Sequence, residues 1–309
     1  STADAVAQCF KCLALKKSAQ WVLEGDIKAC FDKIGHQWLM NNIAVDKRML
    51  EQWLKSGFMD KGLFYRTDEG TPQGGVISPT LMLVTLAGLE QQIKSAALKK
   101  GARANFIGYA DDFVVCCDSE SECRTLRDLV KNKLPEGSRL NDEKTTDCVL
   151  AQRGVDFLGF RITTNKLRVR GRNIGKFKQR IEGVIEKQTE MEYKKPKNAL
   201  KYLIRSLRLK IEGPGEEDLQ EYANAGFTVA RYRRSWIGFF RIVDDDEQIR
   251  HLDRWLRTRV KTYMWKRFGV KTTFSQLQAA GLPTLLNTKY KPRKSLPIEP
   301  QNEVGSISE

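Results

Sequence analysis

Three aspartates, Asp26, Asp111 and Asp112, are the residues of this sequence whose type and spacing could support catalysis. Each of them borders an apolar segment, and Asp111 and Asp112 are adjacent in the chain. Mg²⁺ prefers oxygen ligands and is usually held by one or two carboxylates together with substrate phosphates. Two such ions, about 3.5 to 4 Å apart, can activate an attacking oxygen and stabilise a leaving one. The three carboxylates therefore suggest metal-assisted phosphoryl transfer, whereas an Asp pair taken alone also suits an ordinary hairpin turn.

The segments around these aspartates predict the elements that position them. Residues 20–27 are predicted to form a strand that ends at the first acid, and residues 105–117 a tight β-hairpin with the acid pair at its tip. If the two strands are neighbours in one sheet, the three carboxylates converge at one edge. The other elements predicted up to about residue 165 are a helix over 1–15, helices near 36–43, 47–56, 79–97 and 120–134, and strands near 147–151 and 156–162.

The second half of the chain has a different pattern. Helical spacing extends over residues 173–190, 195–210, 218–241 and 246–268, with a break at Gly213-Pro-Gly215. From residue 284 onward, Pro, Lys, Ser and Asn dominate without apolar periodicity. We therefore expect an α+β part over residues 1–165, an α-helical part over residues 166–285, and a tail or linker over residues 286–309.

The charge follows the same division. The 53 basic and 38 acidic residues leave a net charge of +15. Residues 1–165 contain 22 basic and 21 acidic side chains, whereas residues 166–309 contain 31 and 17. Aromatic residues alternate with basic ones in 231–236 and 255–267, a pattern that can pair with phosphates while the rings pack or stack. Nucleic acid is therefore the favoured partner over an acidic membrane surface, with a generally solvated basic surface as the alternative.

Other classes of protein are disfavoured. The most apolar stretch, Val76 to Leu89, is shorter than a bilayer span and contains a proline, so no membrane helix is expected. Seven cysteines and two histidines lack the paired spacing of a zinc finger, which favours reduced, mostly buried thiols in a cytosol-like compartment. No signal peptide is visible, and because residue 1 is Ser we expect a cut or processed N-terminus.

The order of the motifs resembles one known family. Tyr-Ala-Asp-Asp at 109–112 lies between apolar strands, follows Gly-Thr-Pro-Gln-Gly-Gly-Val-Ile-Ser-Pro at 70–79, and comes after Asp-Ile-Lys-Ala-Cys-Phe-Asp at 26–32. In combination these blocks resemble the ordered motifs of reverse transcriptases. Two later segments, 234–240 and 255–268, are similar to the thumb, or X domain, of group II intron reverse transcriptases, also called maturases. The resemblance implies a right-hand polymerase palm, an antiparallel sheet with helices, followed by an α-helical thumb.

The resemblance also implies roles for individual residues. Asp26, Asp111 and Asp112 would be the catalytic residues and would bind two Mg²⁺ ions together with the carbonyl of Ile27, with Mn²⁺ as a possible substitute. Phe31 would exclude the 2′-hydroxyl of a ribonucleotide, Gln73 would contact the nucleotide, and Lys144 would lie near the triphosphate. If the resemblance is set aside, Phe31 is interpreted as a core aromatic residue, Gln73 as a polar turn residue and Lys144 as a solvated lysine. Two further sets would bind nucleic acid, a primer grip at Leu158 and Gly159 and the basic side chains Arg231, Arg233, Arg234, Arg257, Arg259 and Lys261.

The sequence also departs from the family pattern. Glu24 and Gly108 replace a frequent Asp and Arg, neither of which is one of the three metal-binding acids. The first fingers blocks, which supply basic residues for the triphosphate, are expected upstream of residue 1, so we expect these 309 residues alone to be poorly active. We interpret the protein as an RNA-directed DNA polymerase of group II intron type that uses dNTPs, a DNA primer and an RNA template and also binds intron RNA. A non-catalytic RNA-binding splicing factor and a reverse transcriptase recruited to prokaryotic defence or CRISPR spacer acquisition are the alternatives. The expected location is the cytoplasm of a prokaryote, or an organelle of a eukaryote.

Overall fold

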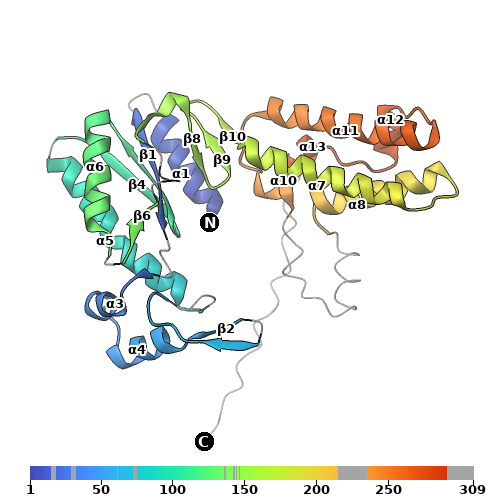
Figure 1. The fold of residues 1–309 in the computed structure, drawn as a ribbon. Coiled ribbons are helices and arrows are strands. Elements are labelled where there is room, and N and C mark those ends of the chain that lie inside the picture. The colour runs from blue at the N-terminus through green and yellow to red at the C-terminus, as the bar shows by residue number, and fades with distance from the viewer. Residues whose placement is uncertain are drawn as a thin grey trace, which may run out of the picture. The chain divides into compact units, whose positions relative to one another are not determined.

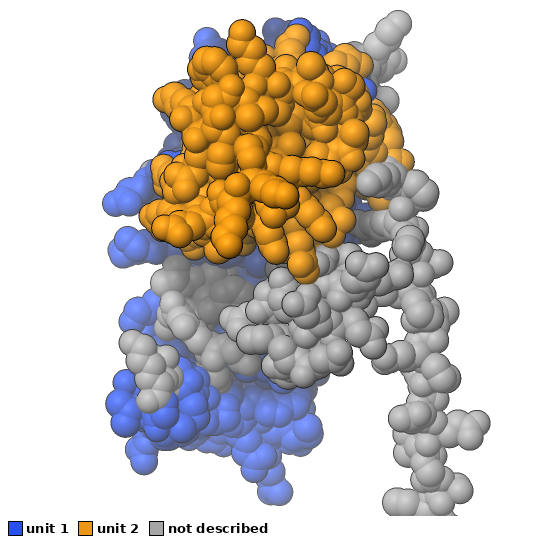
Figure 2. Space-filling view, turned by 90° about the vertical axis from the view of Figure 1, so that its right-hand side faces the viewer, with its two compact units in different colours: residues 1–180, 242–248 blue, residues 181–241, 249–309 orange. Residues whose placement is uncertain are grey.

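The computed structural model describes residues 1–14, 19–28, 33–60, 62–71, 75–99, 101–135, 137–141, 143, 145, 147–214 and 235–290. The chain divides into two compact units, which Figure 2 shows in different colours. The first unit contains residues 1–180 and 242–248, and the second contains residues 181–241 and 249–309. The boundaries between the units fall within α7 (Gly171–Glu190), between residues 241 and 242, and within α11 (Asp246–Phe268), whereas the boundary expected from composition lies at residue 165. As a division of functions, the three-part scheme stays a prediction.

An antiparallel sheet with the strand order β4-β5-β1-β6 forms the centre of the first unit (Figure 1). A further short strand, β7, also pairs with β1. Strand β1 therefore has β5 on one side and the short strands β6 and β7 on the other. The strand bounds are Trp21–Lys28 for β1, Ala104–Tyr109 for β4, Asp112–Cys117 for β5, Arg139–Leu140 for β6 and Val149–Leu150 for β7.

Both faces of this sheet are covered, because alternate residues of β1 and β5 point to opposite sides. Leu23, Val115 and Cys117 belong to a core shared with α5 (Ser78–Lys99) and α6 (Glu120–Lys133). On the other face, Val22 and Cys116 are fully buried where α1 (Thr2–Ala14) packs against β5. Figure 1 shows α1 and α6 on opposite faces of the sheet. The catalytic candidates thus lie on strands that are packed from both sides.

Smaller elements complete the first unit. Helix α3 (His36–Asn42) is followed by α4 (Lys47–Lys55), whose first turn is capped by the Asp46 side chain, an acceptor for the N–H of Met49. The hairpin of β2 (Phe58–Asp60) and β3 (Leu63–Tyr65) was not predicted from the sequence. A second small sheet consists of β8 (Val155–Phe157), β9 (Phe160–Ile162) and β10 (Leu167–Val169), preceded by a 3₁₀ turn at Ala151–Arg153.

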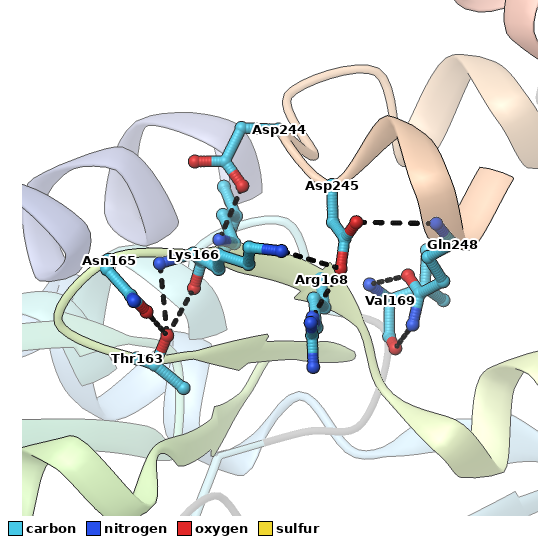
Figure 3. A network of polar contacts seen from close by, with 9 residues as sticks. Thr163, Asn165, Lys166, Arg168, Val169, Asp244, Asp245 and Gln248 are labelled. Carbon is cyan, nitrogen blue, oxygen red and sulfur yellow. Dashed lines mark hydrogen bonds and ion pairs between the residues drawn. The ribbon is translucent and has the colours of Figure 1, made fainter.

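Polar contacts fasten β10 to the segment at residues 244–248 (Figure 3). The N–H of Leu167 donates to Asp244 at 2.7 Å, and the N–H of Val169 donates to the side-chain oxygen of Gln248 at 2.8 Å. The side-chain amide of Gln248 in turn donates to the carbonyl of Val169 at 3.1 Å. The last element of this sheet is therefore held by residues about 80 positions later in the sequence.

The second unit is helical, as expected. Polar contacts join α11 to α7, because Arg259 forms an ion pair with Glu182 at 2.6 Å and the hydroxyl of Tyr263 donates to the carbonyl of Gln188. Within the described residues, no helix combines the length and the apolar character needed to cross a bilayer. The helices, in chain order, are α7 (Gly171–Glu190), α8 (Pro196–Ile211), α10 (Trp236–Phe239), α11 (Asp246–Phe268), α12 (Phe274–Ala279) and α13 (Leu285–Tyr290).

The α+β fold class predicted from the sequence is confirmed, but the expected tail needs a correction. Residues 286–290 belong to α13 rather than to a linker. The buried carboxylate of Asp253 accepts hydrogen bonds from the N–H groups of Leu285 (2.7 Å) and Leu286 (3.2 Å), and Leu285 is itself fully buried. A partner 32 residues away therefore fixes a helix that the local composition does not predict. The helix expected over 218–241 lies mostly outside the described residues.

Candidate active site

Asp26 and Asp112 face each other across neighbouring strands. The antiparallel register of β1 and β5 pairs Trp21 with Cys117 at one end and Asp26 with Asp112 at the other. Residues that are directly opposite on antiparallel strands have Cβ atoms about 4.5 to 5.5 Å apart and project from the same face. Two of the three predicted carboxylates are thus placed side by side at the end of a ladder, with Asp26 buried at 6% exposure.

Asp111 lies beside this pair, in the turn that joins β4 to β5. Tyr109 pairs with Asp112, so only Ala110 and Asp111 lie between the strands. Ala110 has a φ of 55°, in the left-handed region that glycine favours, and such backbone strain in a residue with a side chain is common at functional sites. The N–H of Ile27 donates to the carbonyl of Asp111 at 3.1 Å. Because the N–H and C=O of a strand residue point to the same side, the Ile27 carbonyl is directed toward this turn.

Asp26 is anchored on the opposite side of β1 by residues that the sequence analysis missed. The side-chain amide of Asn141 donates to Oδ2 of Asp26 at 2.7 Å, and the Asn141 backbone N–H donates to the Asp26 carbonyl at 2.8 Å. The Asp26 N–H also donates to the hydroxyl of Thr145 at 3.4 Å. A carboxylate with one oxygen fixed in this way has a restricted orientation, which suits a metal ligand.

Gly25, next to Asp26, is required by its cross-strand neighbour. A Cβ at this position would lie 2.1 Å from the ring of Phe113, which is the ladder partner of Gly25 and covers it. Phe113 stacks in turn on Phe106 at 5.5 Å between ring centroids. The absence of a side chain at Gly25 thus lets an aromatic pair pack beneath the candidate carboxylates.

Glu24 projects from the same face as Asp26, two residues earlier on β1. The pKa of Glu24 is raised to about 7, first by burial and then by the nearby carboxylates of Asp156 and Asp112, while Arg170 and the Asp156 backbone N–H act in the opposite direction. The carboxylate of Glu24 accepts a hydrogen bond from the Asp156 backbone N–H, so it links the main sheet, at the edge where the candidate carboxylates lie, to strand β8. The substitution of Glu for a frequent family Asp keeps an acid at this junction.

The donor set at this edge fits a hard divalent cation, because it consists of carboxylate and backbone carbonyl oxygens. Within the described residues, however, no three His, Cys, Asp or Glu side chains are gathered closely enough to hold a metal ion. The backbone brings Asp26, Asp111 and Asp112 to one edge, while their side chains do not form a closed set of ligands. The predicted two-ion site is therefore supported by ligand type and strand register, and stays a prediction.

Leu158 and Gly159, the predicted primer grip, form the tight turn between β8 and β9. Phe157 pairs with Phe160, and the two turn residues have φ values of 49° and 90°. Positive φ at both central positions is the requirement of the type I′ hairpin turn. The carbonyl of Gly159 accepts hydrogen bonds from the N–H of Arg170 (3.0 Å) and the side chain of Asn173 (3.1 Å). The turn is thus held rigidly against the start of α7.

The predicted basic residues have different positions. The Arg257 guanidinium lies 4.3 Å from the ring centroid of Phe274, and Arg259 forms the ion pair with Glu182, so both already have contacts within the second unit. Lys261 is exposed on α11. The remaining predicted site residues lie outside the described residues, namely Phe31, Gln73, Lys144, Arg231, Arg233 and Arg234.

Comparison with known proteins gives one family match. The profile of the family described as reverse transcriptase (RNA-dependent DNA polymerase) matches residues 1–162. The chain is 31% identical over 188 residues to protein YkfC of Escherichia coli (strain K12), which covers 48% of this chain and 48% of that protein. It is 34% identical over 87 residues to the group II intron-encoded protein LtrA of Lactococcus lactis subsp. cremoris, covering 26% of this chain and 14% of LtrA. The chain thus spans about half of the length of YkfC and a smaller share of LtrA.

Among solved structures, the chain is similar to a telomerase from Candida tropicalis truncated from its C-terminal domain. The TM-score is 0.43 and the sequence identity is 17%, with 55% of this chain and 40% of that chain covered. Residues 1–162, which match the reverse transcriptase family profile, include Asp26, Asp111, Asp112, Leu158 and Gly159.

Proposed function

Since this chain belongs to the reverse transcriptase (RNA-dependent DNA polymerase) family, we propose that it copies RNA into DNA by transferring deoxynucleotides from dNTPs to a primer 3′-hydroxyl. The observation that carries the proposal is the pairing of Asp26 with Asp112 at the end of the β1–β5 ladder, with Asp111 in the adjoining turn. Carboxylates gathered at one sheet edge provide the oxygen ligands that metal-assisted phosphoryl transfer needs.

Several residues prepare the site for this reaction. When bound, a pair of Mg²⁺ ions, or Mn²⁺ in their place, would neutralise the charge that develops on the transferred phosphate. Asp26, Asp111 and Asp112 would hold these ions together with the carbonyl of Ile27, and Asn141 keeps the Asp26 carboxylate in one orientation. The strained turn at Ala110 directs Asp111 to the same edge. The rigid Leu158–Gly159 turn, proposed as the primer grip, would position the primer end.

We extend the proposal to intron RNA. Support comes from the similarity to LtrA, a group II intron-encoded protein, and from the basic second half of the chain. Lys261 is exposed and available for a phosphate, whereas Arg257 and Arg259 would have to exchange an internal contact for one. The selection of deoxynucleotides by Phe31, and the contacts of Gln73 and Lys144 with the incoming nucleotide, stay predictions.

The test is extension of a DNA primer on an RNA template by the full-length protein in Mg²⁺. Asp111→Asn should lower the rate roughly 10³-fold or more, because it removes an anionic ligand at the reacting phosphate, while RNA affinity stays nearly unchanged. Asp128→Asn, which makes the same chemical change at an exposed position of α6, is the matched control and should extend primers normally. If Asp111→Asn stays within about tenfold of the parent rate, the assignment of the carboxylates is wrong.

The same assay separates the alternatives. A non-catalytic splicing factor would bind RNA but extend no primer even with all three aspartates intact. A reverse transcriptase recruited to defence would extend primers, yet it would not promote splicing of an intron RNA added in the same buffer.

A further inference from the structure

A pocket of about 450 Å³ lies in the first unit, beside the β8–β10 sheet and the start of α7. Its lining includes four arginines, Arg161, Arg168, Arg170 and Arg172, and one acidic residue, Asp156. None of these arginines belongs to a motif that predicts a role from the sequence. Four cations around one small cavity require an explanation, because like charges repel unless an anion lies between them.

The strand register explains why the arginines gather. Asp156 pairs with Arg161 across β8 and β9, and Arg161 pairs with Arg168 across β9 and β10. These three side chains alternate with buried apolar neighbours such as Phe160 and Val169, and therefore share the polar face of the sheet. Arg170 and Arg172 follow directly, as the chain leaves β10 and enters α7.

The acids nearby neutralise only part of this charge. One carboxylate, that of Asp156, is shared by Arg161 at 3.2 Å and Arg170 at 2.9 Å. Arg168 contacts the buried Asp245, as Figure 3 shows, and Lys166 lies 3.9 Å from the same carboxylate. Arg161 also donates to the carbonyl of Arg153. The side chains of Arg161, Arg168 and Arg170 are nevertheless each more than 40% exposed, so solvent or a ligand can still reach their guanidinium groups.

Arg172, the fourth arginine of the pocket, lies on a helix rather than on the β8–β10 sheet. It is exposed in the first turn of α7, and that turn contains no acidic side chain. The backbone at this point is rigid, because the N–H of Arg170 and the side chain of Asn173 both donate to the Gly159 carbonyl. The backbone that carries Arg170 and Arg172 is therefore fixed relative to the Leu158–Gly159 turn, which reduces the cost of ordering this part of the pocket on binding.

The guanidinium group presents planar pairs of N–H donors that match two oxygens of a phosphate, and clusters of arginine are typical of phosphate recognition. We propose that this arginine pocket binds a backbone phosphate of a nucleic-acid strand, at a site separate from the carboxylates Asp26, Asp111 and Asp112. The proposal deepens the proposed function and rests on it, since a polymerase that copies RNA supplies the strand. The strand is either single-stranded RNA or a primer–template duplex, which present the same phosphodiester chemistry.

The experiment measures the dissociation constant of the full-length protein for single-stranded RNA and for a DNA primer on an RNA template, as a function of salt. Arg172→Gln and Arg161→Gln should each weaken binding about tenfold at 0.1 M salt and reduce the slope of log Kd against log salt by about one. Arg172→Lys should keep the slope but recover only part of the affinity, because lysine cannot bind a phosphate through two N–H groups in one plane. Arg180→Gln, an exposed arginine two turns later on α7 that does not line the pocket, is the matched control and should change neither quantity.

If the pocket variants weaken binding of the primer–template duplex alone, the bound strand belongs to that duplex. If they weaken binding of both ligands equally, single-stranded RNA is sufficient for binding. If the pocket variants and Arg180→Gln keep the same affinity and salt slope for both ligands, the proposal is wrong. Arg172 contributes no internal ion pair in the described contacts, so its variant should fold, and circular dichroism can check this. Because RNA binding does not require catalysis, this experiment is independent of the primer-extension assay. A protein that extends no primer can still bind RNA through the pocket, and an active polymerase can still lack this binding site.

Discussion

Asn141 donates a hydrogen bond of 2.7 Å from its side-chain amide to Oδ2 of Asp26, which lies 115 residues earlier in the chain. The backbone N–H of Asn141 donates to the Asp26 carbonyl at 2.8 Å, so the two residues are joined twice. A ligand whose second oxygen is held by a neighbour is oriented before any ion or substrate arrives. Asn141 is therefore a positioning residue for the proposed catalysis, acting through Asp26.

Asn141→Ala should lower kcat for primer extension by roughly 10 to 100-fold, the range typical of second partners of metal ligands. The reason is that the backbone bond survives while the carboxylate loses its fixed orientation. The concentration of Mg²⁺ that gives half-maximal activity should rise in parallel, a change that a merely structural defect would not produce. Asn105→Ala, at an exposed position of β4, is the control. A variant with unchanged Mg²⁺ dependence would show that the Asn141 contact has no role in orienting Asp26.

Gly25→Ala should destabilise the first unit, because the new methyl group would lie 2.1 Å from the Phe113 ring. The ring cannot move freely since it stacks on Phe106, so we expect a loss of about 1 to 3 kcal/mol in the free energy of unfolding, as for other overpacked sites. Gly88→Ala, in the middle of α5 with no atom near the added methyl, should instead raise stability by roughly 0.5 to 1 kcal/mol. Urea denaturation of both variants checks the pair, and equal effects in the two would contradict the steric explanation.

The parts of the site that the sequence predicts are those with local signals. Apolar segments on both sides of Asp111 and Asp112 predict a hairpin with the acids at its tip, and the structure has β4 and β5 there. The pairing of β1 with β5 is not local, and it needs the assumption that the two strands are neighbours. Asn141 has no local signal, because its relation to Asp26 depends on β6, a strand of only two residues.

Short strands and distant partners account for the elements that were missed. The three-residue strands β2, β3 and β10 are too short to show an alternating pattern. Strand β10 is stabilised by contacts such as that of Val169 with Gln248, 79 residues later. The arginine pocket has the same origin, since Arg161 and Arg168 become neighbours only through the pairing of β9 with β10. Composition predicts a basic second half, but the arginines of the pocket come from residues 161–172, on both sides of the boundary expected at residue 165, and all of them belong to the first unit.

Asp245→Asn should reduce stability in a pH-dependent way. Burial tends to raise the pKa of Asp245, but the Gln248 N–H and the cations Arg168 and Lys166 outweigh this and hold it below the ordinary 3.8. A carboxyl whose pKa is lower in the folded state stabilises the fold above its unfolded pKa, and this contribution is lost as the pH falls through the folded value. The difference in unfolding free energy between parent and variant, on the order of 1 to 2 kcal/mol at pH 7, should therefore narrow as the pH falls below 3.8.

Urea denaturation at several pH values between 7 and 3 measures this difference, with Asp128→Asn as a control that should show none. A gap between parent and Asp245→Asn that stays constant down to pH 3 would mean that the Asp245 charge contributes nothing.

Cys12 should be a reactive thiol although the cysteines around it are buried. A hydrogen bond with Cys116 lowers the pKa of Cys12 to about 7, while burial acts in the opposite direction. Cys9 and Cys116 have no exposed surface, whereas Cys12 is partly accessible at the end of α1. Because the thiolate is the nucleophile, the rate of alkylation by iodoacetamide at Cys12 should rise with pH and reach half of its maximum near pH 7.

Cys116→Ala removes the hydrogen-bond donor and should move the Cys12 midpoint upward, toward the ordinary value of 9.0. At pH 7 the alkylation rate should then fall roughly tenfold, since the smaller thiolate fraction is partly offset by the greater nucleophilicity of a more basic thiolate. Cys116→Ser keeps a donor at the same position and should keep the midpoint low. Mass spectrometry of the peptide that contains Cys12 follows the reaction at this residue alone. If Cys116→Ala and Cys116→Ser give the same midpoint, the hydrogen bond between the two thiols is not the cause of the reactivity.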